Sequence, residues 1–288
     1  MNSSRNYNSI SPSAKSLLLM KGLTNIPYAR ETAALMQGPE VFDLDFNNKD
    51  FYFWMRVMHF ESRYWSIDQL LAQIDYKNIL ELSSGYSLRG LDLCTKETIH
   101  YIDTDLPEVI AIKQQMIRQL GFESVELKGQ LDLLSLNALD NAAFNTIAAR
   151  FNAGPVTIVN EGLLMYLNTD EKKQFCASIH SLLKERGGYW ITADVYAKLP
   201  PEIRNAIPKS SSETAFHEQH HIEENKFDSY EAAKAFFHEQ GFEIVKEANV
   251  DFKTLSVVPH LLKVLPPEAR NSKTPPPKIQ ATWMLRAI

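Results

Sequence analysis

The stretch Asn78–Arg89, NILELSSGYSLR, decides the fold class of this chain. It opens with a short apolar run of the kind found in strands buried on both faces of a parallel sheet, and it then breaks into three small residues before a helical pattern resumes. The pattern predicts a strand, a tight turn and the start of a helix. In such a turn backbone N–H groups can approach a ligand closely, and Glu81 can accept hydrogen bonds from a cationic or hydroxylated group.

A second acid follows at the end of the next predicted strand. The apolar run Ile99–Ile102 leads into Asp103, about twenty residues after the turn, where a nucleotide-binding fold places an acid for ribose hydroxyls. The alternative is that Glu81 and Asp103 are ordinary strand-end acids of a sheet with an unrelated ligand. Of the three glycines in the dinucleotide-binding pattern, only Gly85 is present.

The composition is that of a soluble globular protein and excludes several classes. The 288 residues are 44% hydrophobic and 23% charged, with a net charge of −5 and no Lys/Arg run, which argues against nucleic-acid binding. Two cysteines, Cys94 and Cys176, are too few for a disulfide framework and are typical of a reducing compartment. No apolar run reaches the ~18 residues of a membrane span, so we expect a cytoplasmic protein that binds neither nucleic acid nor membrane.

Strands and helices alternate regularly from residue 77 onward. This order predicts a Rossmann-like α/β fold with helices on both faces of a mostly parallel seven-stranded methyltransferase sheet, in which one antiparallel strand is added last. Residues 14–74 show helical spacing and aromatic clusters without strand alternation, and we expect residues 1–76 to form a helical cap within the same domain. The main domain then covers residues 77–288, and its long polar interval at 196–228 predicts a lid insertion.

Two motifs resemble one known family. The segments Ile102–Ile110, IDTDLPEVI, and Glu161–Leu167, EGLLMYL, resemble signatures of the leucine carboxyl methyltransferase-like family of S-adenosylmethionine-dependent enzymes, which includes bacterial O-methyltransferases of polyketide type. The resemblance extends from about Ser13 to Leu167 and implies S-adenosylmethionine as the cofactor. It also implies a small-molecule or peptide methyl acceptor as the partner.

The resemblance assigns cofactor contacts position by position. The residues concerned are Lys15, Arg63, Glu81, Ser83, Gly85, Asp103, Asp132, Leu133 and Glu161. It implies that Lys15 and Arg63 bind the carboxylate of the methionine moiety, that Glu161 faces its amino group, and that Asp103 holds the ribose. Cations for a carboxylate and an acid for an ammonium form a chemically coherent set.

The remaining roles concern the turn, the adenine and the methyl group. The resemblance implies that Glu81 and the backbone of residues 83–85 line the turn after the first strand, and that Asp132 and Leu133 meet the adenine edge. It places Tyr166 as the catalytic residue, where the methyl group meets the acceptor. The sequence departs from the family where Ser83 replaces a glycine and where Ser87-Leu88 replaces aspartate-threonine.

The predicted function is transfer of a methyl group from S-adenosylmethionine to a carboxylate or hydroxyl oxygen. Such an in-line displacement depends on alignment, and only a hydroxyl acceptor would benefit from a general base. His217, His220 and His221 lie in the predicted lid and could form part of a metal site, but no third ligand is apparent, so a solvated polar segment is favoured and no metal is predicted. Two alternatives remain open, a nucleotide-dependent oxidoreductase and a non-catalytic S-adenosylmethionine-binding protein.

Overall fold

The structure is a computed structural model that describes residues 11–36, 46–267 and 278–288. The start of the predicted cap (1–10), the segment 37–45 and the proline-rich segment 268–277 lie outside the described residues. The described residues form one seven-stranded sheet in the order β3-β2-β1-β4-β5-β7-β6. Its strands are β1 (Asn78–Leu82), β2 (His100–Asp105), β3 (Gln130–Ser135), β4 (Val156–Asn160), β5 (Gly188–Tyr196), β6 (Phe242–Glu247) and β7 (Gln280–Ala287).

The strand directions agree with the predicted topology. Strands β1 to β5 are joined by parallel pairings, whereas β7 is antiparallel to both of its neighbours, β5 and β6. The last strand of the chain therefore inserts between two earlier strands. The predicted seven-stranded methyltransferase sheet is confirmed.

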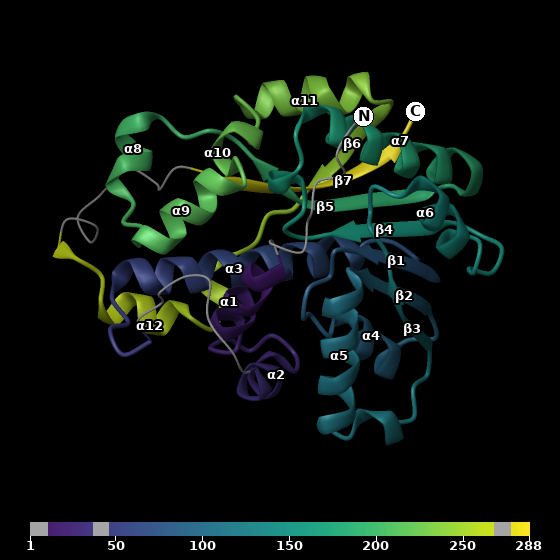
Figure 1. Cartoon of the computed structure of the whole chain (residues 1–288), viewed down its shortest axis with the longest axis horizontal. Helices are drawn as coiled ribbons and strands as arrows, with labels where there is room; N and C mark the ends of the chain where they lie inside the picture. The colour runs from purple at the N-terminus through teal and green to yellow at the C-terminus, as the bar shows by residue number, and fades with distance from the viewer. Residues whose placement is uncertain (1–10, 37–45, 268–277) are drawn as a thin grey trace.

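Helices cover both faces of this sheet, as Figure 1 shows. The helices of the α/β layers are α4 (Arg89–Lys96), α5 (Pro107–Gln119), α6 (Asn141–Ala148), α7 (Thr169–Arg186) and α11 (Tyr230–Glu239). Helices α4 and α5 lie on one side, with the long helix α3 (Phe51–Leu71), and α6, α7 and α11 lie on the other. Successive residues of a buried strand supply the two cores, because side chains alternate across a sheet. Leu80 packs with Phe175 on one face, and its neighbour Ile79 packs with Ile67 on the other.

Two groups of helices stand at the carboxyl edge of the sheet. The N-terminal group contains α1 (Ser11–Lys21), α2 (Ala29–Leu35) and α3, and the interval predicted as a lid contains α8 (Pro201–Ala206), α9 (Ser211–Gln219) and α10 (Ile222–Asn225). A further short helix, α12 (Val258–Lys263), packs against α3. The division into a cap, a main domain and a lid stays a prediction, but both groups face the site described below.

Candidate functional site

A cavity of about 940 Å³ opens at the carboxyl ends of the central strands. Its lining comes from α1 and α3 on one side, from the turns after β1, β2 and β4, and from α8 to α10 on the other side. In parallel α/β sheets, ligands bind at this edge, next to the point where the strand order reverses. Here the order reverses between β1 and β4, and the cavity lies beside both strands.

The turn after β1 has the geometry expected of a ligand-binding turn. Ser83 and Gly85 line the cavity, and both adopt left-handed backbone conformations, with φ of 54° and 55°. Glycine adopts this conformation without strain, whereas a serine in it costs about 1 kcal/mol. The structure thus gives a physical reason for the glycine that the family has at position 83 and shows that serine keeps the turn.

Two acids at the end of β2 have different surroundings. The carboxylate of Asp103 is buried, accepts hydrogen bonds from Lys113 Nζ at 2.8 and 2.9 Å, and does not line the cavity. Asp105 lines the cavity and accepts 2.7 Å hydrogen bonds from the backbone N–H groups of Gly85 and Leu106. Sequence reasoning missed Asp105, although it stands within the same IDTDLPEVI segment.

Glu161 is the centre of the charged part of the site. Its carboxylate is within 2.5 Å of Lys21 Nζ, 3.0 Å of Arg63 Nε and 3.4 Å of Arg89 Nη2. Burial alone would raise the pKa of Glu161, but Lys21, Arg63 and Arg89 together hold it well below its ordinary value. Glu161 is therefore a fixed negative charge surrounded by cations and is not a general base.

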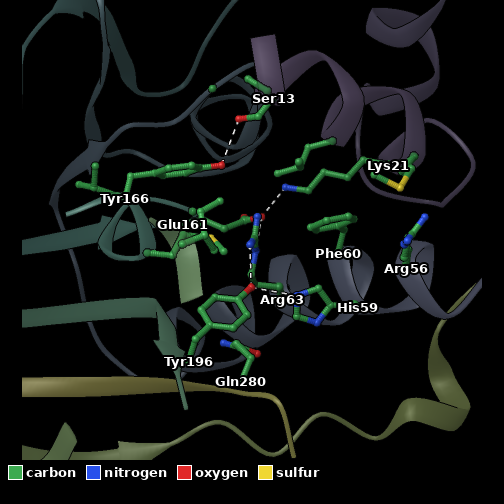
Figure 2. Close-up of a pocket in the computed structure, with 18 of the residues that line it drawn as sticks. Ser13, Lys21, Arg56, His59, Phe60, Arg63, Glu161, Tyr166, Tyr196 and Gln280 are labelled. Atoms are coloured by element: carbon green, nitrogen blue, oxygen red, sulfur yellow. Dashed lines mark hydrogen bonds and ion pairs between the residues drawn. The ribbon is translucent and has the colours of Figure 1, made fainter. Parts of the chain in front are cut away.

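Arg63 reaches into the cavity from α3, as Figure 2 shows. Its Nη1 donates a 2.9 Å hydrogen bond to the hydroxyl of Tyr196, which lies 2.8 Å from His59 Nε2. Burial, and next the charge of Arg63, lower the pKa of His59 to about 3, so the imidazole that is hydrogen-bonded to Tyr196 is neutral. Buried Arg63 Nη2 has no hydrogen-bond partner among the described residues and is available to an anionic ligand.

Tyr166 lines the same cavity from the short 3-10 helix that follows β4. Its hydroxyl lies 3.2 Å from Ser13 Oγ, and its ring makes an edge contact with Phe216 of α9 at a centroid distance of 6.2 Å. Burial raises the pKa of Tyr166, so its hydroxyl stays protonated at neutral pH. The residue therefore joins the strand end, the N-terminal helix and the lid interval at one point (Figure 2).

The structure brings together half of the residues singled out from the sequence. Those that line the cavity are Arg63, Ser83, Gly85, Glu161 and Tyr166. Those that do not line it are Lys15, Glu81, Asp103, Asp132 and Leu133. Their assigned roles stay predictions.

Glu81 and Asp132 are hydrogen-bonded to side chains of the neighbouring strand β2. Glu81 accepts a 2.7 Å hydrogen bond from the Tyr101 hydroxyl inside the sheet, and Asp132 pairs with His100 Nε2 at 2.8 Å. The segment that lines the cavity after β3 is instead residues 136–139.

The three histidines of the lid interval occupy different places. His217 lines the cavity, His220 is buried, and His221 adopts a left-handed conformation just before α10. Within the described ranges, no three His, Cys, Asp or Glu side chains are grouped in a way that could hold a metal ion. In the same part of the chain, every helix is too short or too polar to cross a bilayer.

The fold and this cavity define a Rossmann-like methyltransferase class, and the sequence comparison gives the family. The sequence model of the Leucine carboxyl methyltransferase family matches residues 14–180, more than half of the chain. The chain therefore belongs to the leucine carboxyl methyltransferase family, and S-adenosylmethionine is its cofactor. No curated protein matches the chain in sequence.

Solved structures resemble the chain at low sequence identity. A duf574 family protein from Streptomyces avermitilis ma-4680 has a TM-score of 0.55 and 10% identity, over 95% of this chain and 97% of that one, which shows the fold. Magnesium protoporphyrin IX methyltransferase from Synechocystis PCC 6803, crystallised with bound SAM, has a TM-score of 0.49 and 11% identity over 100% of both chains. Mitomycin 7-O-methyltransferase has a TM-score of 0.48 and 9% identity, over 81% of this chain and 57% of that one.

The described residues fit this cofactor. Arg63 Nη2, a buried donor without a partner in the described structure, suits the carboxylate of the methionine moiety. Glu161 already accepts a hydrogen bond from the ammonium of Lys21, and an amino group of the cofactor has the same chemistry. Asp105 offers carboxylate oxygens beside the open turn at Ser83 and Gly85. Donors and acceptors of the required kinds therefore line one continuous cavity.

Proposed function

We propose that this protein transfers the methyl group of S-adenosylmethionine to a carboxylate oxygen of its acceptor. The observation that carries the proposal is the lack, among the described side chains at the Tyr166 end of the cavity, of a group able to act as a base near neutral pH. When bound, S-adenosylmethionine supplies an electrophilic methyl group on a sulfonium sulfur. The chain's own residues have to bind the cofactor and the acceptor, align the acceptor oxygen with the methyl group, and exclude water.

The side chains near Tyr166 that could accept a proton are poorly suited to do so. The ring of His220 lies 6.1 Å from that of Tyr166, but His220 is buried and does not line the cavity. His59 has a pKa of about 3, and its Nε2 is already hydrogen-bonded to the Tyr196 hydroxyl at 2.8 Å. Burial raises the pKa of Tyr166 and raises that of Tyr196 to about 12, so both hydroxyls are donors. A phenol or alcohol acceptor would need help in losing its proton. A carboxylate oxygen already carries the electron pair that forms the new bond, so no proton has to leave the acceptor.

The proposed cofactor contacts follow the residues that line the cavity. We assign the methionine carboxylate to Arg63, the methionine amino group to Glu161, and the ribose hydroxyls to Asp105 in place of Asp103. The support for Asp105 is its exposure to the cavity and the pairing of Asp103 with Lys113. Burial raises the pKa of Asp105, while backbone N–H groups oppose that shift.

Tyr166 has a positioning and donor role in this proposal. Its hydroxyl stays protonated and is held near Ser13, so it can donate a hydrogen bond to one oxygen of an acceptor carboxylate. The other oxygen is then directed toward the methyl group. Alignment of this kind is the main source of rate enhancement for a displacement that needs no acid or base.

Matched acid and alcohol acceptors test the proposal. A series of aliphatic and aryl carboxylic acids is incubated with the protein and methyl-labelled S-adenosylmethionine, beside the corresponding primary alcohols and phenols. We expect label in products of the acids alone, and we expect mild alkali to release it as methanol, because methyl esters hydrolyse and methyl ethers do not. Alkali-stable label on the alcohols or phenols would refute the proposal.

A further inference from the structure

The end of the cavity away from Glu161 carries its own cluster of charges. Six charged side chains from α3 and the 204–226 interval line this end, namely Arg56, Arg204, Lys209, Lys226, Glu213 and Glu223. Four of them are cations and two are carboxylates, so the cluster has a surplus of positive charge. In an otherwise largely apolar cavity, such a surplus favours an anionic ligand group.

The ion pairs of this cluster leave Lys209 unmatched. Arg56 pairs with Glu213 at 2.7 Å, and Lys226 pairs with Glu223 at 2.6 Å. Within the described part of the chain, no carboxylate lies within 4.0 Å of the Lys209 ammonium, whose polar contact is His217 Nδ1 at 3.2 Å. Arg56 also donates a hydrogen bond to the carbonyl of Pro208, which ties the backbone next to Lys209 to α3. Lys209 is thus an exposed residue that lines the cavity, and its ammonium contacts an imidazole and not a counter-charge.

The pKa values of His217 and Lys209 reflect the positive surplus around them. Burial, and next the positive charges of Lys209 and Lys226, lower the pKa of His217 to about 4, whereas Glu223 opposes the shift. The imidazole is therefore neutral and accepts an N–H of Lys209. Burial also lowers the pKa of Lys209, with Lys226 adding to that effect and Glu213 and Glu223 opposing it. An anion bound between these groups would oppose both shifts.

Helix α3 gives the distance between the two charged ends. Arg63, at the Glu161 end, and Arg56, at the Lys209 end, both line the cavity and are separated by two turns of the helix. At 1.5 Å per residue, seven residues correspond to about 10 Å along the axis. Phe60 lies between the two arginines in Figure 2, and Met58 also lines the cavity, beside the neutral His59, so the interval is largely apolar.

We infer that the acceptor carries a second anionic group, bound by Lys209 at the cavity wall and separated from the reacting carboxylate by an apolar spacer. This inference rests on the proposed function for the position of the reacting carboxylate. It limits the class of preferred acceptors to elongated dianions. A flexible monoacid can still react, but it leaves Lys209 without a counter-charge.

Binding measurements test the inference without turnover. Linear α,ω-dicarboxylic acids of increasing length, and the monoacids of equal length that end in a methyl group, are titrated calorimetrically into the protein saturated with S-adenosylhomocysteine. We expect an optimum length at which the diacid binds about tenfold tighter than its monoacid, the value of one charged hydrogen bond. Equal binding of diacids and monoacids at every length, or no diacid binding at all, would overturn the inference.

Two variants locate the second anion. Lys209→Gln should abolish the diacid advantage and leave the monoacid dissociation constant unchanged. Lys198→Gln is the matched control, because Lys198 pairs with Asp228 and does not line the cavity, so both constants should be unchanged. The diacid should also raise the pKa of His217 in histidine proton NMR spectra. A diacid advantage that persists in Lys209→Gln, or a His217 resonance that the diacid does not affect, would contradict the assignment.

Binding and methylation assays with the same acids distinguish failure of the second anion site from failure of the proposed reaction. If the monoacids are methylated but diacids gain nothing, the carboxylate-directed function stands and the second anion site is wrong. If diacids bind through Lys209 but no carboxylic acid is methylated, the anion site stands and the proposed reaction is wrong.

Discussion

Lys113 places its ammonium nitrogen 2.8 and 2.9 Å from the two carboxylate oxygens of Asp103, and both side chains are buried. Lys113 Nζ also donates a 2.6 Å hydrogen bond to Ser84 Oγ in the turn after β1. The pair thus connects β2, α5 and the cofactor turn. Its position gives Asp103 a buried structural partner, while the ribose contact predicted from the sequence stays a prediction.

Breaking this pair from one side should destabilise the fold. Lys113→Met leaves the Asp103 carboxylate buried without a counter-charge, and we expect the free energy of unfolding to fall by about 3–5 kcal/mol. Chemical denaturation followed by circular dichroism measures the change. The double variant Asp103→Asn/Lys113→Met removes both charges and should recover much of the loss. If Lys113→Met is as stable as the parent protein, the pair does not stabilise the fold.

Variants of the two acids of β2 should differ in their effect on cofactor affinity. Asp105→Asn keeps the shape of a side chain that lines the cavity but removes its charge, and we expect S-adenosylhomocysteine to bind about tenfold more weakly. Asp103→Asn should lower stability and leave the dissociation constant of the folded protein nearly unchanged. Calorimetric titration of both variants decides between them. Weaker binding in Asp103→Asn alone would restore the assignment made from the sequence.

Removal of the Tyr166 hydroxyl should affect turnover more than cofactor affinity. Tyr166→Phe retains the ring that contacts Phe216 but loses the donor near Ser13. We expect kcat to fall at least about tenfold, in line with the loss of one positioned donor, with the cofactor dissociation constant within about twofold. Ser13→Ala is the control for loss of the partner hydroxyl. Full activity in Tyr166→Phe would make Tyr166 a packing residue.

Glu81 should make stability depend on pH. Burial, with Asp103 adding to its effect and Arg89 opposing it, raises the pKa of Glu81 from 4.5 to about 7. Between these values the folded protein retains a proton that the unfolded chain has released, so the contribution of Glu81 to the free energy of unfolding falls as pH rises. Glu81→Gln should show a smaller decrease across this window in denaturant titrations. An identical pH dependence in the variant would contradict the assigned pKa.

The sequence was sufficient for the fold because the decisive strands have an unambiguous pattern. The runs that became β1 and β4 are buried along their whole length, as expected of central parallel strands. The final strand was predicted to be antiparallel from the order of helix, strand, long connection and strand, and β7 has that direction. These strands could be predicted because the pattern that identifies each of them lies within its own residues.

The site was predictable only where a residue's role follows from its place in the chain. Ser83, Gly85 and Glu161 follow strands directly, so the sheet itself brings them to the cavity. Asp103 and Asp105 lie two residues apart at the end of β2, and nothing in that spacing reveals that Lys113 of the next helix neutralises the first of them. Tertiary packing determines which of the two side chains lines the cavity.

The acceptor end was hidden from sequence reasoning for a related reason. Arg56 and Glu213 meet across a separation of 157 residues, and the polar interval that contains Glu213 carries no signal that identifies its partner. That interval could be predicted to face the site, but the positive surplus of the cavity-lining cluster that it forms with Arg56 became apparent only when α3 was placed against it.

The most direct test of the central claim is the pH dependence of kcat/KM with a carboxylic acid acceptor and saturating cofactor. If the acceptor oxygen is ionised beforehand and no side chain acts as a base, kcat/KM should be constant from about pH 5.5 to 7.5, the range in which an ordinary histidine titrates. Glu81→Gln is measured in parallel, because Glu81 has a pKa of about 7. A rise in kcat/KM with an apparent pKa in this range that persists in Glu81→Gln would reveal a general base and contradict the account.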